Sequence, residues 1–264
     1  LPAVGKLSRE LGNTKLLLLF VQGFGVYGGM GKPVAFPQSA SNRLAHFCFR
    51  LMGKAVRRGQ CVLGAETEGM RQELEQFSGL PAKLFPHPVP VPEVGEEEDE
   101  DGGSGEIVLT APGFARHEKG SDLLRTAIEK MLQSDDLPPV RFILQWAEPF
   151  AVPEGGDLGP GPILEADPRV ELVNESLGEE AYFALLRRSD LVLLPYRRNS
   201  YHNRLSRVAI EAAGIGRPLI YMKGTWSGEV ADIAGTGVAI AEETAGSLEE
   251  AMRSGIEGFA QLRQ

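Results

Sequence analysis

The stretch that decides the fold is "DLVLLPYRRNSYHNRLSRVAIEAAGIGRPLIYM", residues 190–222. It begins and ends with short apolar runs, 190–196 and 217–222, which have the length and near-continuous hydrophobicity of buried strands. Between them, residues 206–215 repeat apolar side chains at helical spacing. This order predicts a strand–helix–strand unit of a parallel sheet. It also places one acidic residue, Glu211, inside an apolar helix.

The same alternation continues on both sides of this stretch. Near-continuous apolar strands separated by helices predict a doubly wound parallel sheet, whose ligands bind beyond the carboxyl ends of the strands. The predicted strands are 106–112, 140–146, 170–173, 190–196, 217–222 and 237–241, and the predicted helices are 121–132, 179–188, 206–215, 227–233 and 247–256.

A change of composition at residues 88–105 predicts a linker, because "PVPVPEVGEEEDEDGGSG" joins a proline-rich run to an acidic one. The triplet Asp99-Glu100-Asp101 has DxD spacing, but a self-repelling run is poor support for a metal ion, so we predict no metal site. Residues 1–87 show fewer elements and predict a partial N-terminal α/β domain on the acceptor side. Residues 106–264 predict a Rossmann-like donor-binding domain.

Composition narrows the function. The chain has 264 residues and a formal net charge of -9, which argues against nonspecific nucleic-acid binding. Cys48 and Cys61 belong to no CxxC or Cys/His cluster. This favours a protein of a reducing compartment and argues against a structural zinc site in it. No apolar run reaches the roughly 18 residues of a membrane span. We therefore expect a cytoplasmic protein, with the inner face of the membrane as an alternative location.

The segment "GFGVYG" (23–28) follows a predicted strand and spells GxGxxG, the pattern of a dinucleotide-binding loop. However, the segment Met30 to Pro33 is unfavourable for the start of the helix that should follow such a loop. No Asp or Glu occurs between Glu10 and Glu66, so the acid that would hold a ribose is absent. A mobile glycine loop is the favoured interpretation.

The predicted helix 43–58 has a basic side. Two interpretations stay open: a solvated helix face, or a surface for anionic partners that gives peripheral membrane contact. Its apolar stripe comprises Leu44, Phe47, Cys48, Leu51, Met52 and Ala55, and its basic stripe comprises Arg43, His46, Arg50, Lys54 and Arg57.

The loop "APGFARHEKGSDLL" (111–124) combines features of a diphosphate site at the end of a strand. Gly113 would let a ligand approach the backbone closely. Arg116 offers a fork of donors and Lys119 a compact charge. The alternative is two surface cations beside Glu118.

Glu211 fits a site for the rest of a nucleotide. Ser206 is a candidate N-cap, so an anion is favoured at the start of the predicted helix. Glu211 lies about 7 Å further along the axis, where a carboxylate can accept hydrogen bonds from two ribose hydroxyls. The alternative is a core glutamate neutralised by Arg204 or Arg207.

Together these segments resemble the retaining nucleotide-sugar glycosyltransferases of the GT-B fold, in the large group that shares a Glu-x7-Glu motif. The resemblance covers about residues 60–255. It implies that Arg116 and Lys119 bind the donor diphosphate, that Glu211 binds the ribose, and that "VNESL" (173–177) lies near the nucleobase. The sequence departs from the motif at Asn203, which replaces the first glutamate, and at Ser206, which replaces a glycine. The part before the linker is also shorter than in such enzymes.

The resulting prediction is a GT-B-like α/β protein that transfers a sugar from a nucleoside diphosphate sugar to a carbohydrate or lipid-linked acceptor, with retention and without a metal or other cofactor. The catalytic candidates are Arg116, Lys119 and Asn203, and the donor-binding candidates are Gly113, Ser206 and Glu211. The main alternative is a noncatalytic nucleotide-sugar-binding or partner protein of the same fold. An isomerase or a phosphorylase is less favoured, because no acid–base pair for the sugar and no pyridoxal lysine is evident.

Overall fold

The computed structural model describes residues 15–30, 32–90 and 105–262. The chain divides into two compact units: unit 1 comprises residues 1–88 and 198–205, and unit 2 comprises residues 89–197 and 206–264. Segment 198–205, which the sequence analysis assigned to the C-terminal domain, therefore belongs to unit 1 by its contacts. Most of the predicted linker, including Asp99-Glu100-Asp101, lies outside the described residues.

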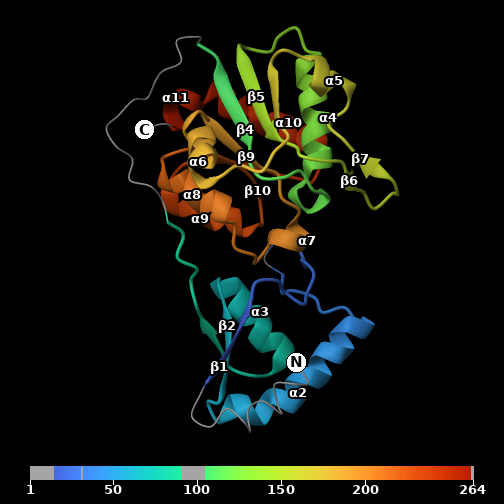
Figure 1. The fold of residues 1–264 in the computed structure, drawn as a ribbon, viewed down its shortest axis with the longest axis vertical. Coiled ribbons are helices and arrows are strands. Elements are labelled where there is room, and N and C mark those ends of the chain that lie inside the picture. Colours follow the sequence, from blue (N-terminus) through green and yellow to red (C-terminus); the bar gives the residue numbers. More distant parts are fainter. Residues whose placement is uncertain (1–14, 31, 91–104, 263–264) are drawn as a thin grey trace. The chain divides into compact units, whose positions relative to one another are not determined.

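Unit 2 contains a parallel sheet of six strands in the order β11-β10-β9-β4-β5-β8. Its strands β4, β5, β9 and β10 are labelled in Figure 1. The first strand of this unit, β4, lies in the middle, next to β9, and the later strands extend the sheet in both directions. This arrangement confirms the predicted doubly wound sheet. The strands are β4 (Ile107–Ala111), β5 (Val140–Gln145), β8 (Val170–Val173), β9 (Leu191–Leu194), β10 (Leu219–Met222) and β11 (Gly237–Ile240).

Helices cover both faces of this sheet. On one face, alternate strand residues such as Leu109, Phe142 and Ile220 share a core with α4, α5 and α10. On the other face, α6, α8 and α9 lie together (Figure 1). All four residues of β9 are buried, as expected for a central parallel strand. The helices are α4 (Ser121–Leu132), α5 (Pro162–Ala166), α6 (Glu179–Arg187), α8 (Arg207–Gly214), α9 (Trp226–Ala234), α10 (Ala245–Glu257) and α11 (Phe259–Leu262), with the short helix η1 (His117–Lys119).

The helix α8 begins as predicted, because the Ser206 hydroxyl accepts a hydrogen bond from the Ala209 N–H at 3.2 Å. Gly216 follows the helix with φ +74°, which lets the chain reverse into β10. The predictions did not include α5 or the small hairpin β6 (Phe150–Ala151) and β7 (Asp157–Leu158). Two-residue strands leave too little periodicity to be recognised in a sequence.

Unit 1 has a three-stranded parallel sheet in the order β1-β2-β3. Both crossovers run in the same direction, so their helices pack on one face, around Phe49, Leu63 and Phe77. On the other face, Leu17 and Leu19 of β1 are exposed. The elements are β1 (Leu16–Phe20), α2 (Ala40–Arg57), β2 (Cys61–Ala65), α3 (Glu68–Ser78), β3 (Ala82–Leu84) and the short helix α7 (Arg198–Tyr201).

The loop 23–28 does not open a helix, because α2 begins only at Ala40. Val26 instead forms an antiparallel bridge with Ala35. The amides of Phe24 and Gly25, which a dinucleotide loop would direct at a phosphate, donate to the carboxylate of Glu73 at 2.7 and 2.8 Å. The Glu73 carboxylate thus accepts the hydrogen bonds that a bound phosphate would accept in a dinucleotide site. The glycine loop was expected to be mobile, and the structure instead joins two of its amides to Glu73.

The apolar stripe predicted on residues 43–58 is divided in the structure. Cys48, Met52 and Ala55 are buried, whereas the other members of the stripe are exposed. Phe49, which lay outside the predicted stripe, is 1% exposed and lies in the core. The buried side of α2 is therefore rotated away from the predicted one. The exposed members are Leu44, Phe47 and Leu51.

Candidate functional site

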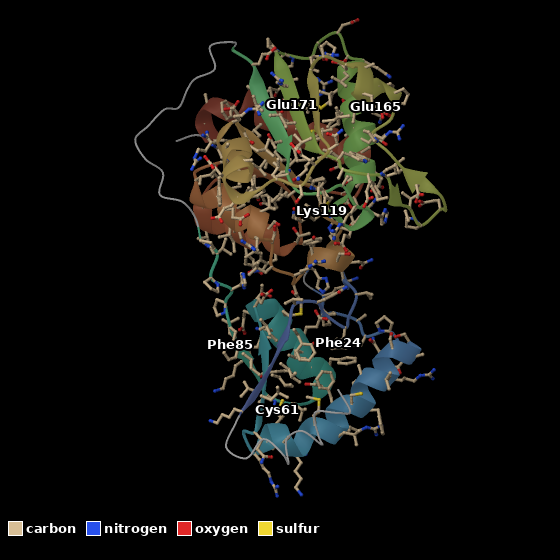
Figure 2. All side chains as sticks on the ribbon, in the orientation of Figure 1. Phe24, Cys61, Phe85, Lys119, Glu165 and Glu171 are labelled. Carbon is tan, nitrogen blue, oxygen red and sulfur yellow. The ribbon has the colours of Figure 1, made fainter. Side chains whose placement is uncertain are left out.

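The order of the six strands fixes where unit 2 is expected to bind a ligand. The connections from the neighbouring strands β4 and β9 leave in opposite directions, and ligands of open α/β sheets bind at such a switch point, beyond the carboxyl ends. The loop 112–120 follows β4 and Pro195 follows β9. Lys119 lies at this edge of unit 2, whereas Glu171 lies at the opposite edge (Figure 2).

Gly113 and Lys119 are brought together in the loop 112–120. Gly113 has φ +78°, and its N–H donates to the Gln145 side chain at 2.6 Å. A Cβ atom at Gly113 would lie 2.5 Å from Lys119 Nζ. The glycine therefore makes room for the ammonium group beside the backbone.

The loop 112–120 also approaches the end of β9 closely. A Cβ atom at Gly120 would lie 2.1 Å from the Pro195 carbonyl oxygen, so only glycine fits there. The Arg197 N–H donates to the Glu118 carbonyl at 2.9 Å. These contacts hold the two loops of the switch point together.

The cations near this edge differ in their partners. Arg197 pairs with Asp122 and, at 3.6 Å, with Glu243, so the fold largely compensates its charge. The Arg116 side chain is 57% exposed and lies 3.8 Å from Glu118, which makes only a weak surface pair. The exposed Arg116 side chain can thus contact an anionic ligand, whereas the Arg197 side chain is already held by ion pairs within the protein. Arg197 and Asp122 were not among the site residues predicted from the sequence.

Glu211 lies beside a pocket of about 360 Å³ between α6 and α8. Its side chain is 7% exposed; it accepts hydrogen bonds from the Tyr182 hydroxyl at 2.8 Å and from Arg207 at 3.2 Å. The pairing with Arg207 is the one that the alternative interpretation expected. However, the carboxylate also faces the pocket, and Arg207 is 56% exposed, so this pair is weak. The pocket is lined by Pro90, Leu177, Glu179, Tyr182, Phe183, Arg207, Val208 and Glu211.

Tyr182 and Gln145 are further polar residues of this region that were not predicted from the sequence. Burial, together with the charge and hydrogen bond of Glu211, raises the pKa of the Tyr182 phenol, so it remains a donor to the carboxylate. Gln145 donates to the Glu175 carbonyl at 3.0 Å and accepts from Gly113, so it joins the loop after β4 to residues 173–177. A polar residue at the end of an apolar strand was the signal for Gln145. No sequence signal linked Tyr182 to Glu211.

The six predicted site residues are distributed over both units. Gly113, Arg116 and Lys119 share one loop, and Ser206 and Glu211 belong to the start of α8; all five are in unit 2. None of the residues that line the pocket beside Glu211 belongs to the loop 112–120. Asn203 is in unit 1, where its amide donates to Glu73 at 2.9 Å and its carbonyl accepts from Thr67 at 2.5 Å. Its side chain is therefore already engaged within unit 1.

Two further properties concern the described residues only. They contain no group of three or more His, Cys, Asp or Glu side chains that could hold a metal ion. None of their helices is both long enough and apolar enough to cross a membrane.

Comparison with solved structures identifies the fold. Sucrose-phosphate synthase from Thermosynechococcus elongatus superposes with a TM-score of 0.67 at 18% identity, over 99% of this chain and 63% of that one. A UDP-forming α,α-trehalose-phosphate synthase from Burkholderia xenovorans gives 0.66 at 13%, over 99% and 65%. HepE from Anabaena in complex with UDP gives 0.61 at 14%, over 99% and 68%.

The chain has the α/β fold of the GT-B glycosyltransferases. It spans about 63% of the length of the sucrose-phosphate synthase chain. No protein-family model and no curated protein sequence matches this chain.

Proposed function

We propose that this chain binds a nucleoside diphosphate sugar in unit 2 and transfers the sugar to a hydroxyl group of a carbohydrate or lipid-linked acceptor. The observation that carries the proposal is the contact between Lys119 and Gly113 at the switch point of a GT-B sheet. There, an ammonium group lies against a backbone that has no side chain to keep a ligand away. A ligand with closely spaced negative charges, such as a diphosphate, suits this arrangement.

In the proposed reaction Lys119 and Arg116 bind the diphosphate and offset the charge that grows on it as the sugar departs. The first turn of α8, capped by Ser206, adds the positive end of a helix. Because these groups already compensate the diphosphate charge, the proposed transfer needs no metal. Retention of configuration follows from the family that the sequence resembles and is part of the proposal.

The proposed site for the nucleoside is the pocket beside Glu211. Tyr182 holds one oxygen of the carboxylate, and each oxygen can accept a second hydrogen bond from a ribose hydroxyl. Leu177, which ends the predicted nucleobase segment, lines the same pocket. Arg207 is exposed enough to leave Glu211 when a ligand enters.

A noncatalytic nucleotide-sugar-binding protein is the second candidate. The amide of Asn203, which replaces the first glutamate of the motif, is bound to Glu73 and supplies no negative charge to a reacting sugar. We therefore assign Asn203 to the structure of unit 1 and not to the sugar. Hydrolysis of UDP-sugars, measured on protein that binds UDP, separates the two candidates: binding without turnover identifies the noncatalytic protein.

Calorimetric titration with UDP, and with ADP and GDP for comparison, tests the donor site. Lys119→Met and Arg116→Gln should each weaken nucleotide binding about tenfold or more, because each removes a charge-assisted contact. Lys130→Met removes an exposed charge from α4 and is the control, with unchanged affinity. Unchanged affinity in the first two variants would refute the proposed site.

A further inference from the structure

The outer side of α2 carries a row of exposed apolar side chains. Leu44 is 61% exposed, Phe47 48% and Leu51 49%. Their spacing of three and four residues places them on one side of the helix. Single exposed apolar residues are common in proteins, but a contiguous row marks a surface that contacts something apolar.

A row of cations runs directly beside these apolar residues. At 100° per residue, the apolar row and the cations occupy neighbouring arcs of the same exposed side. The structure describes all of α2, and within the described residues none of these cations forms an ion pair. We call the two rows together the α2 outer face: Leu44, Phe47, Leu51, Arg43, Arg50, Lys54 and Arg57.

The charge of this region is opposite to that of the whole protein. The chain carries a net charge of -9, yet it has no Asp or Glu between Glu10 and Glu66. The helix α2 itself contains no acidic residue. The positive potential of the α2 outer face is therefore not reduced by carboxylates of its own segment, and its partner is expected to be anionic.

We propose that the α2 outer face binds the surface of an anionic lipid bilayer. Leu44, Phe47 and Leu51 would enter the boundary between headgroups and acyl chains, and the adjacent cations would remain at the level of the lipid phosphates. This is how interfacial helices bind, with apolar burial and headgroup attraction acting together. The inference goes beyond the donor chemistry and does not depend on it.

The composition of the α2 outer face favours lipid over other partners. A second copy of this chain, docked by the same face around a two-fold axis, would bring cations against cations. Nucleic-acid surfaces recognise cations but offer little contact for two leucines and a phenylalanine projecting together. An anionic bilayer offers contacts to both rows at once: apolar acyl chains to the leucines and the phenylalanine, and phosphates to the cations. An acidic protein partner is the remaining case, and the presence or absence of binding to anionic vesicles distinguishes it from lipid.

Vesicle flotation of the full chain tests the proposal. Vesicles of phosphatidylcholine alone are compared with vesicles containing about one third phosphatidylglycerol. One variant, Leu44→Gln/Phe47→Gln/Leu51→Gln, removes the apolar row, and another, Arg50→Gln/Lys54→Gln, removes two cations. The matched control Lys130→Gln/Arg187→Gln removes the same charge from exposed positions of unit 2.

We expect the unsubstituted protein and the control to float with the anionic vesicles only, and the two α2 variants to bind at least about tenfold more weakly. Circular dichroism checks that each variant is folded, and UDP affinity should be equal in all of them, which separates this result from the donor site. Failure of the unsubstituted protein to bind anionic vesicles overturns the proposal. So does binding that both α2 variants retain, or a dimer in light scattering that the apolar variant abolishes without any vesicle binding.

Discussion

The carboxylate of Glu73 accepts a hydrogen bond from the side-chain amide of Asn203 at 2.9 Å, although 130 residues separate them in sequence. The same carboxylate, which is fully buried, accepts the N–H groups of Phe24 and Gly25 and lies 3.2 Å from His202 Nε2. A Cβ atom at Gly23 would lie 2.2 Å from it. Within unit 1, Glu73 thus joins the glycine loop to segment 198–205.

Replacing this carboxylate should destabilise unit 1. Glu73→Gln keeps the shape but turns an amide group toward His202 or Asn203, which are themselves donors. We expect a loss of about 2–3 kcal/mol in the free energy of unfolding, the range for hydrogen bonds to buried charged groups. Both tryptophans of the chain, Trp146 and Trp226, are in unit 2, so their fluorescence follows unit 2 alone. Far-UV circular dichroism follows both units, and the part of its urea transition that tryptophan fluorescence does not share reports unit 1.

Glu68→Gln is the control for this substitution. Glu68 lies on the same helix, α3, but its side chain is 50% exposed, and its ion pair with Arg71 is a surface pair. Its loss should change the free energy of unfolding by less than about 1 kcal/mol. Equal effects of the two substitutions would mean that the Glu73 network contributes nothing beyond a surface pair.

The protonation of His202 should make the stability of unit 1 depend on pH. Its Nδ1 lies 2.9 Å from the Arg198 carbonyl and its Nε2 faces Glu73, so both ring nitrogens meet acceptors. Burial lowers the pKa of His202, but these partners raise it more, and the net pKa lies above the ordinary 6.5. Burial raises the pKa of Glu73, but donors from His202, Asn203 and Gly25 outweigh it, so Glu73 stays ionised.

The sign of the effect follows from the raised pKa. Protonated His202 contributes stability that is fully present below its unfolded pKa, and this stability is lost as the pH rises through the folded pKa. Urea unfolding between about pH 5.5 and about pH 8.5 should therefore show unit 1 weakening toward the alkaline end. His202→Gln should flatten this dependence, whereas His87→Gln, at an exposed position, should retain it. A slope that survives in His202→Gln would assign the effect to another group.

Much of unit 2 could be predicted from the sequence, because its strands are continuous apolar runs and its helices have clear periods and caps. The helix at 121–132 has the predicted bounds, and Ser206 caps α8 as expected. These features depend on neighbours in sequence. The orientation of α2 could not be predicted, because Leu44 and Phe49 are both apolar and only tertiary packing, here against Leu63 and Phe77, decides which is buried.

Pairings between distant side chains were beyond sequence reasoning. Asn203 was predicted as a site residue because of its spacing in sequence from Glu211. Its amide instead donates to Glu73, a residue of a different segment that no local pattern connects to it. Likewise, Tyr182 meets Glu211 only because α6 and α8 pack side by side. By contrast, Gly113 and Lys119 are six residues apart in one loop, and there the sequence pattern corresponds to a real contact.

The contact between Gly113 and Lys119 can be tested with an added methyl group. In Gly113→Ala the new Cβ would lie 2.5 Å from Lys119 Nζ, so the ammonium group must move away from the backbone. We expect UDP to bind about tenfold more weakly, equivalent to about 1.4 kcal/mol. The positive φ of +78° also strains alanine, and this should cost about 1–2 kcal/mol of stability.

Gly155→Ala separates these two effects. Gly155 has φ +97° but no atom within 4 Å of the added Cβ, so it introduces backbone strain without displacing a side chain. Calorimetry should show normal UDP binding in Gly155→Ala, with a comparable loss of thermal stability. If both variants bound UDP equally, the position of the Lys119 ammonium group would not matter for the diphosphate.

The role of Glu211 can be tested by removing one ribose hydroxyl from the ligand. If the carboxylate accepts hydrogen bonds from the ribose, UDP should bind more tightly than 2′-deoxy-UDP, by about tenfold for one charge-assisted hydrogen bond. Glu211→Gln should weaken the binding of UDP more than the binding of 2′-deoxy-UDP, because the charged acceptor is gone. The difference in affinity between the two nucleotides should therefore become smaller. Glu179→Gln is the matched control, since Glu179 lines the same pocket but is exposed. If the difference in affinity between the two nucleotides were the same in Glu211→Gln, the Glu211 carboxylate would be a partner of Tyr182 and Arg207 only. The ribose would then have to bind at another part of unit 2.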